Sequence, residues 1–159
     1  MTTTLVKDVM TRAPYPIDPE APVETATAVM RERGVRHLPV VDDTGKLLGM
    51  VSDRDVRDAV FAPAFAERLS ASARRRLRSV AGTLENMRVK DVMSWGGLTT
   101  EPDALLAQAA AVMFEQRVGS LAVVKNGRLV GIVTERDVLR ALALTLTSVR
   151  GVDPDTYLW

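Results

Sequence analysis

The chain carries one motif twice, and this repetition constrains its fold more than any other feature. The first copy is Gly49-Met-Val-Ser-Asp-Arg-Asp55 and the second is Gly131-Ile-Val-Thr-Glu-Arg-Asp137. In each copy an apolar run is followed by a hydroxyl residue and then by charged residues. This order predicts a strand leading into a helix that Ser52 or Thr134 caps. Two interpretations are open. The hydroxyl and carboxylate either only cap the helix, or they mark a helix start that attracts phosphate while the carboxylate holds ribose hydroxyls.

The repetition extends over most of the chain. Val6-Lys-Asp-Val-Met10 returns 83 residues later as Val89-Lys-Asp-Val-Met93, and Met30 returns at the same distance as Met113. Beyond the next strand the distance falls to 82, because the second copy has one residue fewer in a turn. Asn126-Gly127 in that turn predicts a two-residue hairpin, since both residue types tolerate positive φ. A deletion confined to a turn indicates a true structural repeat.

The order of motifs resembles a known family. Each copy has a Val-x-Asp-Val-Met lead-in, a helix, a strand such as Arg-His-Leu-Pro-Val-Val at 36–41, a turn, and the motif that ends in aspartate. This order resembles the cystathionine-β-synthase (CBS) domain over residues 5–60 and 88–143, and two in tandem resemble a CBS pair, or Bateman module. The resemblance implies an α/β (α+β) fold: two CBS repeats, each a small mixed sheet with packed helices, related by pseudo-twofold symmetry.

We therefore divide the sequence into a first CBS repeat (1–60), a helical linker (61–87), a second CBS repeat (88–144) and a C-terminal tail (145–159). A repeat of this length alone buries little surface, so mutual packing is expected. Apolar residues at three- and four-residue spacing predict an amphipathic linker helix over residues 64–84. Its basic run Arg74–Arg78 is either a solvated face or a surface for anions or an acidic partner.

Composition limits the possible functions. The chain has 159 residues, 47% of them hydrophobic and 26% charged, with a formal net charge of +1. Such a balance argues against a general nucleic-acid or membrane-surface role. The lack of cysteine excludes disulfides, thiolate metal sites and a cysteine nucleophile. No apolar run approaches the roughly 20 residues that span a bilayer, so we expect a soluble cytoplasmic protein.

Periodicity predicts the main elements of each repeat. A helix beginning near Pro22 is expected to turn four residues inward: Val23, Ala26, Met30 and Arg33. Strands at 37–41 and 47–51 should form a hairpin. In the second repeat a helix over 104–117 should bury Leu105, Ala109, Val112 and Met113. A short apolar helix is expected over 138–144, and the tail residues Tyr157 and Trp159 should pack on the body or on a partner.

The resemblance also nominates residues that bind a ligand, and no residue is nominated as catalytic or as a metal ligand. Expected near adenine are Tyr15, Pro16, Ile17, Leu98, Thr99 and Thr100. Expected at the border of the cleft are Arg36, His37, Gly119 and Ser120. Expected to hold ribose or phosphate are Ser52, Arg54, Asp55, Thr134, Arg136 and Asp137. Tyr15 has an alternative role in surface packing, and His37 an alternative structural role.

Two further features bear on these sites. Arg54 and Arg136 fall in the first turn of a predicted helix, where the helix dipole disfavours cations, and this favours a role in binding phosphate. Trp95 precedes Gly96-Gly97, which permits close backbone approach to a ligand, and its ring can stack on the ligand or pack at an interface. Because Gly119-Ser120 replaces Arg36-His37, we expect the two clefts to differ.

Three functions are open. The first is a stand-alone regulatory module that binds adenine nucleotides in the clefts between repeats and signals conformationally to a partner. Its ligand would be AMP, ADP, ATP or S-adenosylmethionine, with or without magnesium, and the module would be a homodimer. The second is a ligand-free dimerisation or interaction scaffold. The third, an enzyme, is disfavoured because the sequence lacks a glycine-rich phosphate loop, a metal triad and a nucleophile with a paired base.

Overall fold

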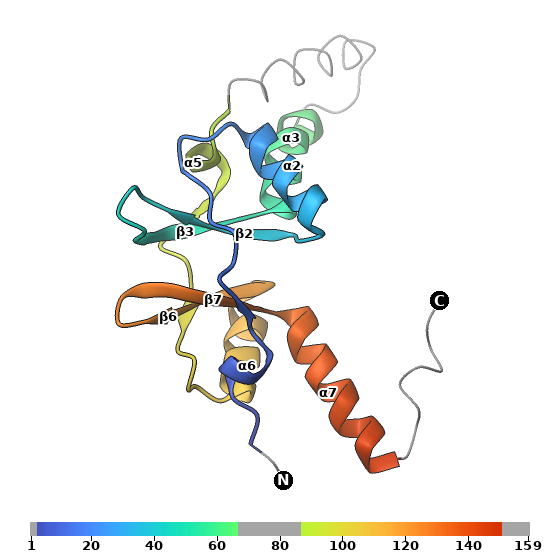
Figure 1. Ribbon diagram of the computed structural model, residues 1–159. Coiled ribbons are helices and arrows are strands. Elements are labelled where there is room, and N and C mark those ends of the chain that lie inside the picture. Colours follow the sequence, from blue (N-terminus) through green and yellow to red (C-terminus); the bar gives the residue numbers. More distant parts are fainter. Residues whose placement is uncertain (1–2, 67–86, 151–159) are drawn as a thin grey trace. The chain divides into compact units, whose positions relative to one another are not determined.

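The computed structural model describes residues 3–66 and 87–150, and they divide into two units. Unit 1 comprises residues 1–13 and 99–159, and unit 2 comprises residues 14–98. Each unit thus combines the lead-in of one repeat with the body of the other, whereas the predicted repeats follow sequence order (Figure 1). The basic run Arg74–Arg78, most of the predicted linker helix, and the tail aromatic residues lie outside the described residues.

Unit 2 is built on a three-stranded antiparallel sheet, β2-β3-β4. Its strands are β2 (His37–Val41), β3 (Leu47–Ser52) and β4 (Ser94–Trp95), and its helices are α2 (Val23–Arg33), α3 (Asp53–Ala66) and α5 (Val89–Val92). These helices lie on one side of the predicted β2–β3 hairpin, which is confirmed (Figure 1). Leu38, Val40 and Val51 pack there against Val23 and Met30.

Unit 1 has the same plan with one more named strand. Its helices are α1 (Val6–Val9), α6 (Leu106–Gln116) and α7 (Glu135–Arg150). Its strands are β1 (Thr11–Arg12), β5 (Thr99–Thr100), β6 (Ser120–Lys125) and β7 (Arg128–Thr134), in the order β1-β7-β6-β5. The β5–β6 pair is parallel and the other pairs are antiparallel, so this sheet is mixed, as predicted.

The lead-in helices dock in the same way in both units. Val6 and Lys7 donate backbone hydrogen bonds to the carbonyl oxygens of Ala104 and Pro102, both at 2.9 Å. In unit 2, the corresponding N–H groups of α5 donate to Ala21 and Pro19, also at 2.9 Å. The valine that begins each helix is completely buried. The Val-x-Asp-Val-Met motif therefore anchors a short helix to the unit formed by the other repeat's body.

The first glycine of each repeated motif permits a close backbone approach. A Cβ atom on Gly49 would overlap the carbonyl oxygen of Ser94 in β4. A Cβ atom on Gly131 would lie 2.6 Å from Met10 Sδ and 3.1 Å from the carbonyl oxygen of Thr11. Glycine is thus required here by the strand that follows the lead-in, and not by a turn.

The two hairpin turns are closed by different means. Asn126 and Gly127 have φ angles of 52° and 75°, which confirms the predicted two-residue turn. In the longer first turn, Asp42 Oδ1 accepts hydrogen bonds from the Thr44 hydroxyl at 2.6 Å and from the Thr44 and Lys46 backbone N–H groups at 2.9 Å. The longer turn also has backbone hydrogen bonds, from Asp42 N–H to the Lys46 carbonyl and from Gly45 N–H to the Asp42 carbonyl, both at 3.0 Å, so the Asp42 side chain adds to the backbone closure.

Several predicted details are wrong. Arg33 is exposed rather than inward, because it ends α2 and its guanidinium lies over an aromatic ring. Leu105 is 39% exposed, because it precedes α6 in extended conformation, and Leu106 takes its place in the core. Helix α7 runs to Arg150 rather than ending at 144, since neither glycine nor proline interrupts it before residue 151.

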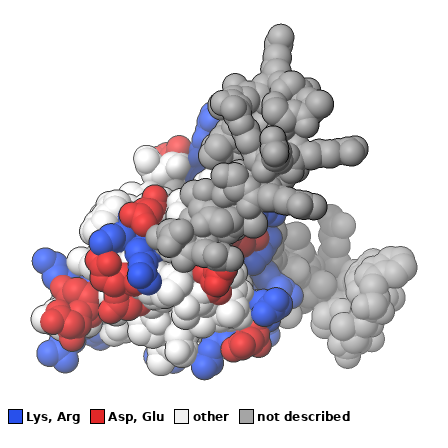
Figure 2. Space-filling view, turned by 90° about the horizontal axis from the view of Figure 1, so that it is seen from above, with Lys and Arg blue, Asp and Glu red and all other residues white. Residues whose placement is uncertain are grey.

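Two findings bear on the membrane and nucleic-acid roles that the composition disfavours. No helix in the described part of the chain is both long and apolar enough to cross a membrane. Acidic and basic side chains are interspersed over the described part of the face shown in Figure 2. On that visible area, the basic side chains do not gather into an extended surface of the kind that nucleic-acid binding requires.

Candidate functional site

The two repeated motifs form the same capping arrangement at the starts of α3 and α7. Asp55 Oδ2 accepts from the Ser52 backbone N–H at 2.7 Å and from the Ser52 hydroxyl at 2.6 Å. Asp137 Oδ2 accepts from Thr134 in the same way, at 2.9 and 2.7 Å. In return, each aspartate N–H donates to the hydroxyl oxygen, at 3.2 and 3.3 Å. Each hydroxyl and carboxylate is therefore held in one orientation before any ligand arrives.

The loop before each hairpin is tied to the same helix start. The N–H group of Asp53 donates to the carbonyl oxygen of Arg36 at 3.0 Å, and that of Glu135 donates to Gly119 at 3.1 Å. His37 pairs with Ser52 across the hairpin, and Ser120 pairs with Thr134. The residues nominated for the cleft border and for the ribose thus lie together in each unit, on two adjacent strands and one helix end.

The segments nominated for adenine run beside the central strands, and proline shortens one of them. Ile17 donates to the Pro39 carbonyl at 2.9 Å and accepts from Val41 at 3.1 Å. In a strand, the N–H and C=O of one residue point the same way, so Pro39 lacks the donor that would extend this parallel pairing. Ala122 retains its N–H at that position, and β5 there pairs over two residues, Thr99 and Thr100.

The side chains of these segments differ in exposure. Ile17 is only 5% exposed and belongs to the core of unit 2, so Tyr15 and Pro16 are the accessible residues there. The Arg33 guanidinium lies 4.4 Å from the centre of the Tyr15 ring, a cation–π contact. Thr99 is exposed and Thr100 is half-buried. A ligand that stacks on Tyr15 would meet Arg33 as well.

The nominated arginines face solvent. Arg54 and Arg136 are exposed in the first turns of α3 and α7, and neither side chain has a hydrogen-bond or ion-pair partner among the described residues. His37 is half-buried and has a contact of its own. Within residues 3–66 and 87–150, no cluster of three or more histidine, aspartate or glutamate side chains could hold a metal ion. Arg54 and Arg136 are the cations of these first turns, which also carry two carboxylates each, Asp53 and Asp55 in α3 and Glu135 and Asp137 in α7.

The nominated residues fall into two sets. Those of unit 2 are Tyr15, Pro16, Ile17, Arg36, His37, Ser52, Arg54, Asp55 and Leu98. Those of unit 1 are Thr99, Thr100, Gly119, Ser120, Thr134, Arg136 and Asp137. Within each unit the structure brings together the loop, strand and helix-start residues, whereas Leu98 is assigned to a different unit from its sequence neighbour Thr99.

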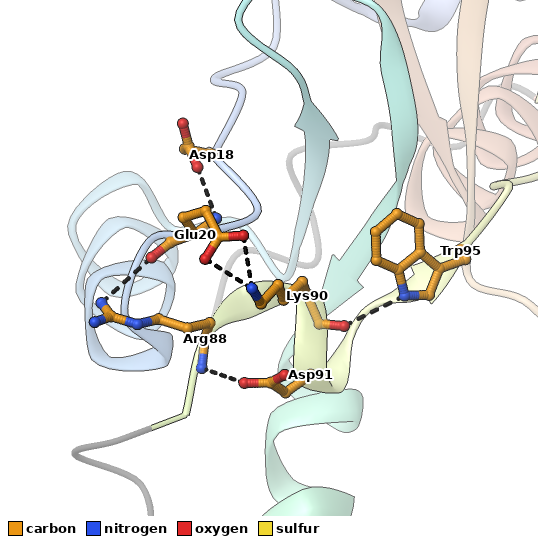
Figure 3. A network of polar contacts seen from close by, with 6 residues as sticks. All are labelled: Asp18, Glu20, Arg88, Lys90, Asp91 and Trp95. Carbon is orange, nitrogen blue, oxygen red and sulfur yellow. Dashed lines mark hydrogen bonds and ion pairs between the residues drawn. The ribbon is translucent and has the colours of Figure 1, made fainter.

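Trp95 belongs to a polar network in unit 2 rather than to the helix start (Figure 3). Its ring is 63% exposed, and its Nε1–H donates to the Lys90 carbonyl at 3.3 Å. Lys90 Nζ lies 2.7 Å from Glu20 Oε1, and Arg88 donates to the Glu20 carbonyl at 3.3 Å. An interface role for the exposed ring stays a prediction, and within this network the indole joins β4 to α5.

Sequence reasoning missed the ion pair that accompanies each lead-in helix. Lys7 Nζ lies 2.6 Å from Asp103 Oδ1, and Lys90 pairs with Glu20 at the corresponding place. The hydrogen bond between Lys7 and Asp103 raises the pKa of the lysine and lowers the pKa of the carboxyl. The signal was present in the sequence, because both partners recur 83 residues apart with opposite charges retained.

Two small α/β units, each with a hydroxyl-capped helix start beside a β-hairpin, define a tandem-repeat module. A family model described as "CBS domain" matches residues 6–62 and 89–144. The chain belongs to this family and carries two of its domains in tandem, as the sequence predicted.

Similar proteins fall into two kinds. A CBS domain-containing protein of Dictyostelium discoideum is 32% identical over 149 residues, which cover 91% of this chain and 95% of that protein. A homoserine O-acetyltransferase of Methanococcoides burtonii is 34% identical over 143 residues, but these make up only 25% of the enzyme. The chain thus spans nearly all of one relative and about a quarter of the other.

Solved structures support the same fold. The Arabidopsis thaliana CBS-pair protein CBSX2, solved in complex with AMP, has a TM-score of 0.68 and 29% identity. The alignment covers 90% of this chain and 98% of CBSX2. The tandem CBS architecture is therefore shared over almost the whole length of both proteins.

Proposed function

We propose that this chain is a regulatory CBS-pair module that binds an AMP-like adenine nucleotide at the starts of α3 and α7. The observation that carries the proposal is the paired geometry of Ser52 with Asp55 and of Thr134 with Asp137. Each pair sets a carboxylate, a hydroxyl and a helix N-terminus side by side. A carboxylate can accept hydrogen bonds from ribose hydroxyls, and a helix N-terminus with a hydroxyl beside it can bind phosphate. The AMP complex of CBSX2 supports the choice of ligand.

The proposed roles follow from the groups that remain available. Asp55 Oδ2 and Asp137 Oδ2 are used by the cap, but within the described part of the chain their Oδ1 atoms accept no hydrogen bond. A ribose hydroxyl can donate to Oδ1 without breaking the cap. Arg54 and Arg136 then meet the phosphate with permanently charged planar groups. Tyr15 and Pro16 offer an apolar surface to adenine in unit 2.

A ligand-free scaffold is the second candidate, because each cap is complete without a ligand. In that case the carboxylates serve only the backbone. Unit 1 also carries an apolar helix face that suits an interaction role: Leu139, Leu142 and Leu146 on α7 are between 51% and 64% exposed. The absence of catalysis is part of both proposals.

Thermal unfolding of the full chain with AMP, ADP, ATP or S-adenosylmethionine separates the two candidates. Ligand at 100 times its Kd stabilises each occupied site by about 2.7 kcal/mol, and each kcal/mol raises Tm by roughly 2–4 °C for a chain of this size. We expect AMP to raise Tm. We expect Asp55→Asn and Asp137→Asn each to remove part of the shift, since an amide loses the charged grip on the diol.

The chain contains matched controls for these variants. Asp91 Oδ2 accepts from the Arg88 backbone N–H at 2.8 Å, and Asp8 Oδ2 accepts from Leu5 at 2.8 Å. Both are capping aspartates at the starts of the short lead-in helices, and neither caps α3 or α7. Asp91→Asn should lower the baseline Tm and leave the AMP-induced shift intact. A wild type that ignores all four nucleotides, or a double Asp55/Asp137 variant with a full shift, would leave the scaffold as the function.

The proposal includes a homodimer and conformational signalling to a partner protein. The exposed leucines of α7 are consistent with a second copy packing against this helix. Light scattering at micromolar concentration should give about twice the 17.3 kDa chain mass. Replacing Leu139 and Leu142 with glutamine should shift the protein to monomer, and a monomeric wild type would contradict this part of the proposal alone.

A further inference from the structure

Unit 1 contains a hollow of about 500 Å³ at the turn end of the β6–β7 hairpin. Thr134, which caps α7, lies at the other end of β7. The hollow is therefore separate from the helix start described above. The lead-in contributes Lys7, Met10 and Arg12 to its lining, and the hairpin contributes Lys125, Leu129 and Val130. Pro102 and Asp103 complete one side.

Among the described lining residues, three are cationic and one is acidic. Lys7 Nζ lies 2.6 Å from Asp103 Oδ1, and Arg12 Nη2 donates to the Lys7 carbonyl oxygen at 3.2 Å. Lys125 lies close enough to Asp103 to contribute to the lowered pKa of that carboxyl. Lys7 and Lys125 therefore both act on the Asp103 carboxylate, and Arg12 lies beside Lys7, so the lining has an excess of two positive charges.

The fold does not require this charge. The positions in unit 2 that correspond to Lys7, Asp103, Arg12 and Lys125 hold Lys90, Glu20, Trp95 and Asp42. There the lysine–carboxylate pair is retained, at 2.7 Å. The other two cations are replaced by an indole and a second carboxylate. The same backbone frame is thus built with excess positive charge in one unit and excess negative charge in the other.

We propose that this hollow in unit 1 binds a small organic phosphate monoester. A phosphate monoester carries about −1.5 to −2 charges at neutral pH, which matches the excess of two positive charges. The guanidinium of Arg12 suits a planar, two-point grip on phosphate oxygens. Met10, Leu129 and Val130 provide apolar contact for the organic part. The hollow lies within the roughly 300–1,000 Å³ typical of small-molecule sites.

NMR titration of the full chain with phenyl phosphate tests the site. Phenyl phosphate supplies both the dianion and an apolar group. We expect saturable shifts of the backbone amides around Lys7, Arg12 and Lys125. The amides at Asp55 and Asp137 should not follow the same curve, which distinguishes this site from the proposed nucleotide sites. Because the cationic groups are exposed, the affinity should fall as salt is raised.

Three variants sharpen the test. Lys125→Gln should weaken binding by about tenfold or more, because it removes one charged hydrogen bond. Lys46→Gln is the matched control, since Lys46 is an exposed lysine in the corresponding turn of unit 2, and it should have no effect. Asp103→Asn should strengthen binding, because it removes the competing carboxylate and frees Lys7.

Three results with phenyl phosphate, and a fourth with benzoate, would overturn the proposal. The first is a wild type without saturable shifts at these amides. The second is a Lys125→Gln variant that binds phenyl phosphate as the wild type does, and the third is an Asp103→Asn variant that binds it more weakly while its amide spectrum stays that of the folded protein. Benzoate, which has the same ring and a single negative charge, should bind more weakly, and equal binding would reject phosphate as the ligand class.

Discussion

Units 1 and 2 share a hydrogen-bonded frame, but different side chains occupy several equivalent positions on it. The two units share the buried valine that starts each lead-in helix, the motif glycine, and the aspartate that caps the following helix. Different are the residues before the hairpin, the proline in β2, and the cations at the end of the hairpin. The shared positions are those that close the backbone, whereas, under the proposals above, the differing positions set what each unit binds.

Even at a shared glycine, a side chain would meet different obstacles in the two units. Gly49→Ala would place Cβ against the Ser94 backbone, which cannot move without breaking β4. Gly131→Ala meets the flexible end of Met10 first, and the Thr11 carbonyl at 3.1 Å. We expect Gly49→Ala to cost about 3 kcal/mol or more and Gly131→Ala about 1–2 kcal/mol. Urea denaturation measures both.

Gly97→Ala is the control for these glycine variants. Its Cβ would lie 3.4 Å from the nearest atom, Gly49 Cα, which is ordinary contact, and Gly97 does not have a positive φ angle. This variant should change stability by less than about 1 kcal/mol. If Gly49→Ala were no more destabilising than Gly97→Ala, that result would contradict the close contact between Gly49 and the Ser94 backbone in β4.

The ends of α2 and α6 provide a smaller contrast. Both helices end in a left-handed residue, Gly34 with φ 64° and Arg117 with φ 56°. Glycine adopts this conformation without steric cost, whereas a side chain costs roughly 1 kcal/mol. Arg117→Gly should therefore stabilise unit 1, and Gly34→Ala should destabilise unit 2, each by about 1 kcal/mol. Opposite signs in urea denaturation are the expected result, and equal signs would contradict it.

Periodicity and repetition predict the elements well, because they report which face of a helix or strand is buried. The hairpins, the capped helix starts and the Asn126-Gly127 turn all follow from residues close together in sequence. The repeat also predicts the family, since it preserves the order of five motifs. The nominated helix-start and loop residues do lie together, although what they bind stays a proposal.

The errors arise where one backbone step changes the phase or where a long-range contact decides. Leu105 and Leu106 cannot be ranked from periodicity alone, because the helix begins at Leu106, two residues later than expected. Arg33 occupies an inward phase of α2, but Tyr15 provides it with a contact outside the core. The grouping of residues 1–13 with 99–159 depends on pairings such as Leu5 with Leu105, which no local pattern encodes.

The two hairpin turns allow the smallest of these contrasts to be measured by pH. Hydrogen bonds from the Thr44 hydroxyl and the Lys46 N–H lower the pKa of Asp42 below its usual 3.8. A carboxyl whose pKa is lower in the folded state stabilises the fold above its unfolded pKa and loses that contribution as pH falls through the folded value. The turn in unit 2 should therefore loosen in acid, below about pH 3.8.

The turn at Asn126-Gly127 contains no titratable group, so it should not follow Asp42. NMR titration from pH 6 to pH 2 should show the amides of Thr44 and Lys46 moving together with an apparent pKa below 3.8, while the amides of Asn126 and Gly127 stay off that curve. Thr44→Val removes the hydroxyl that contributes most, so the apparent pKa should rise toward the ordinary value. An unshifted midpoint in the wild type, or a Thr44→Val variant with an unchanged midpoint, would show that the Asp42 side chain does not close the first turn.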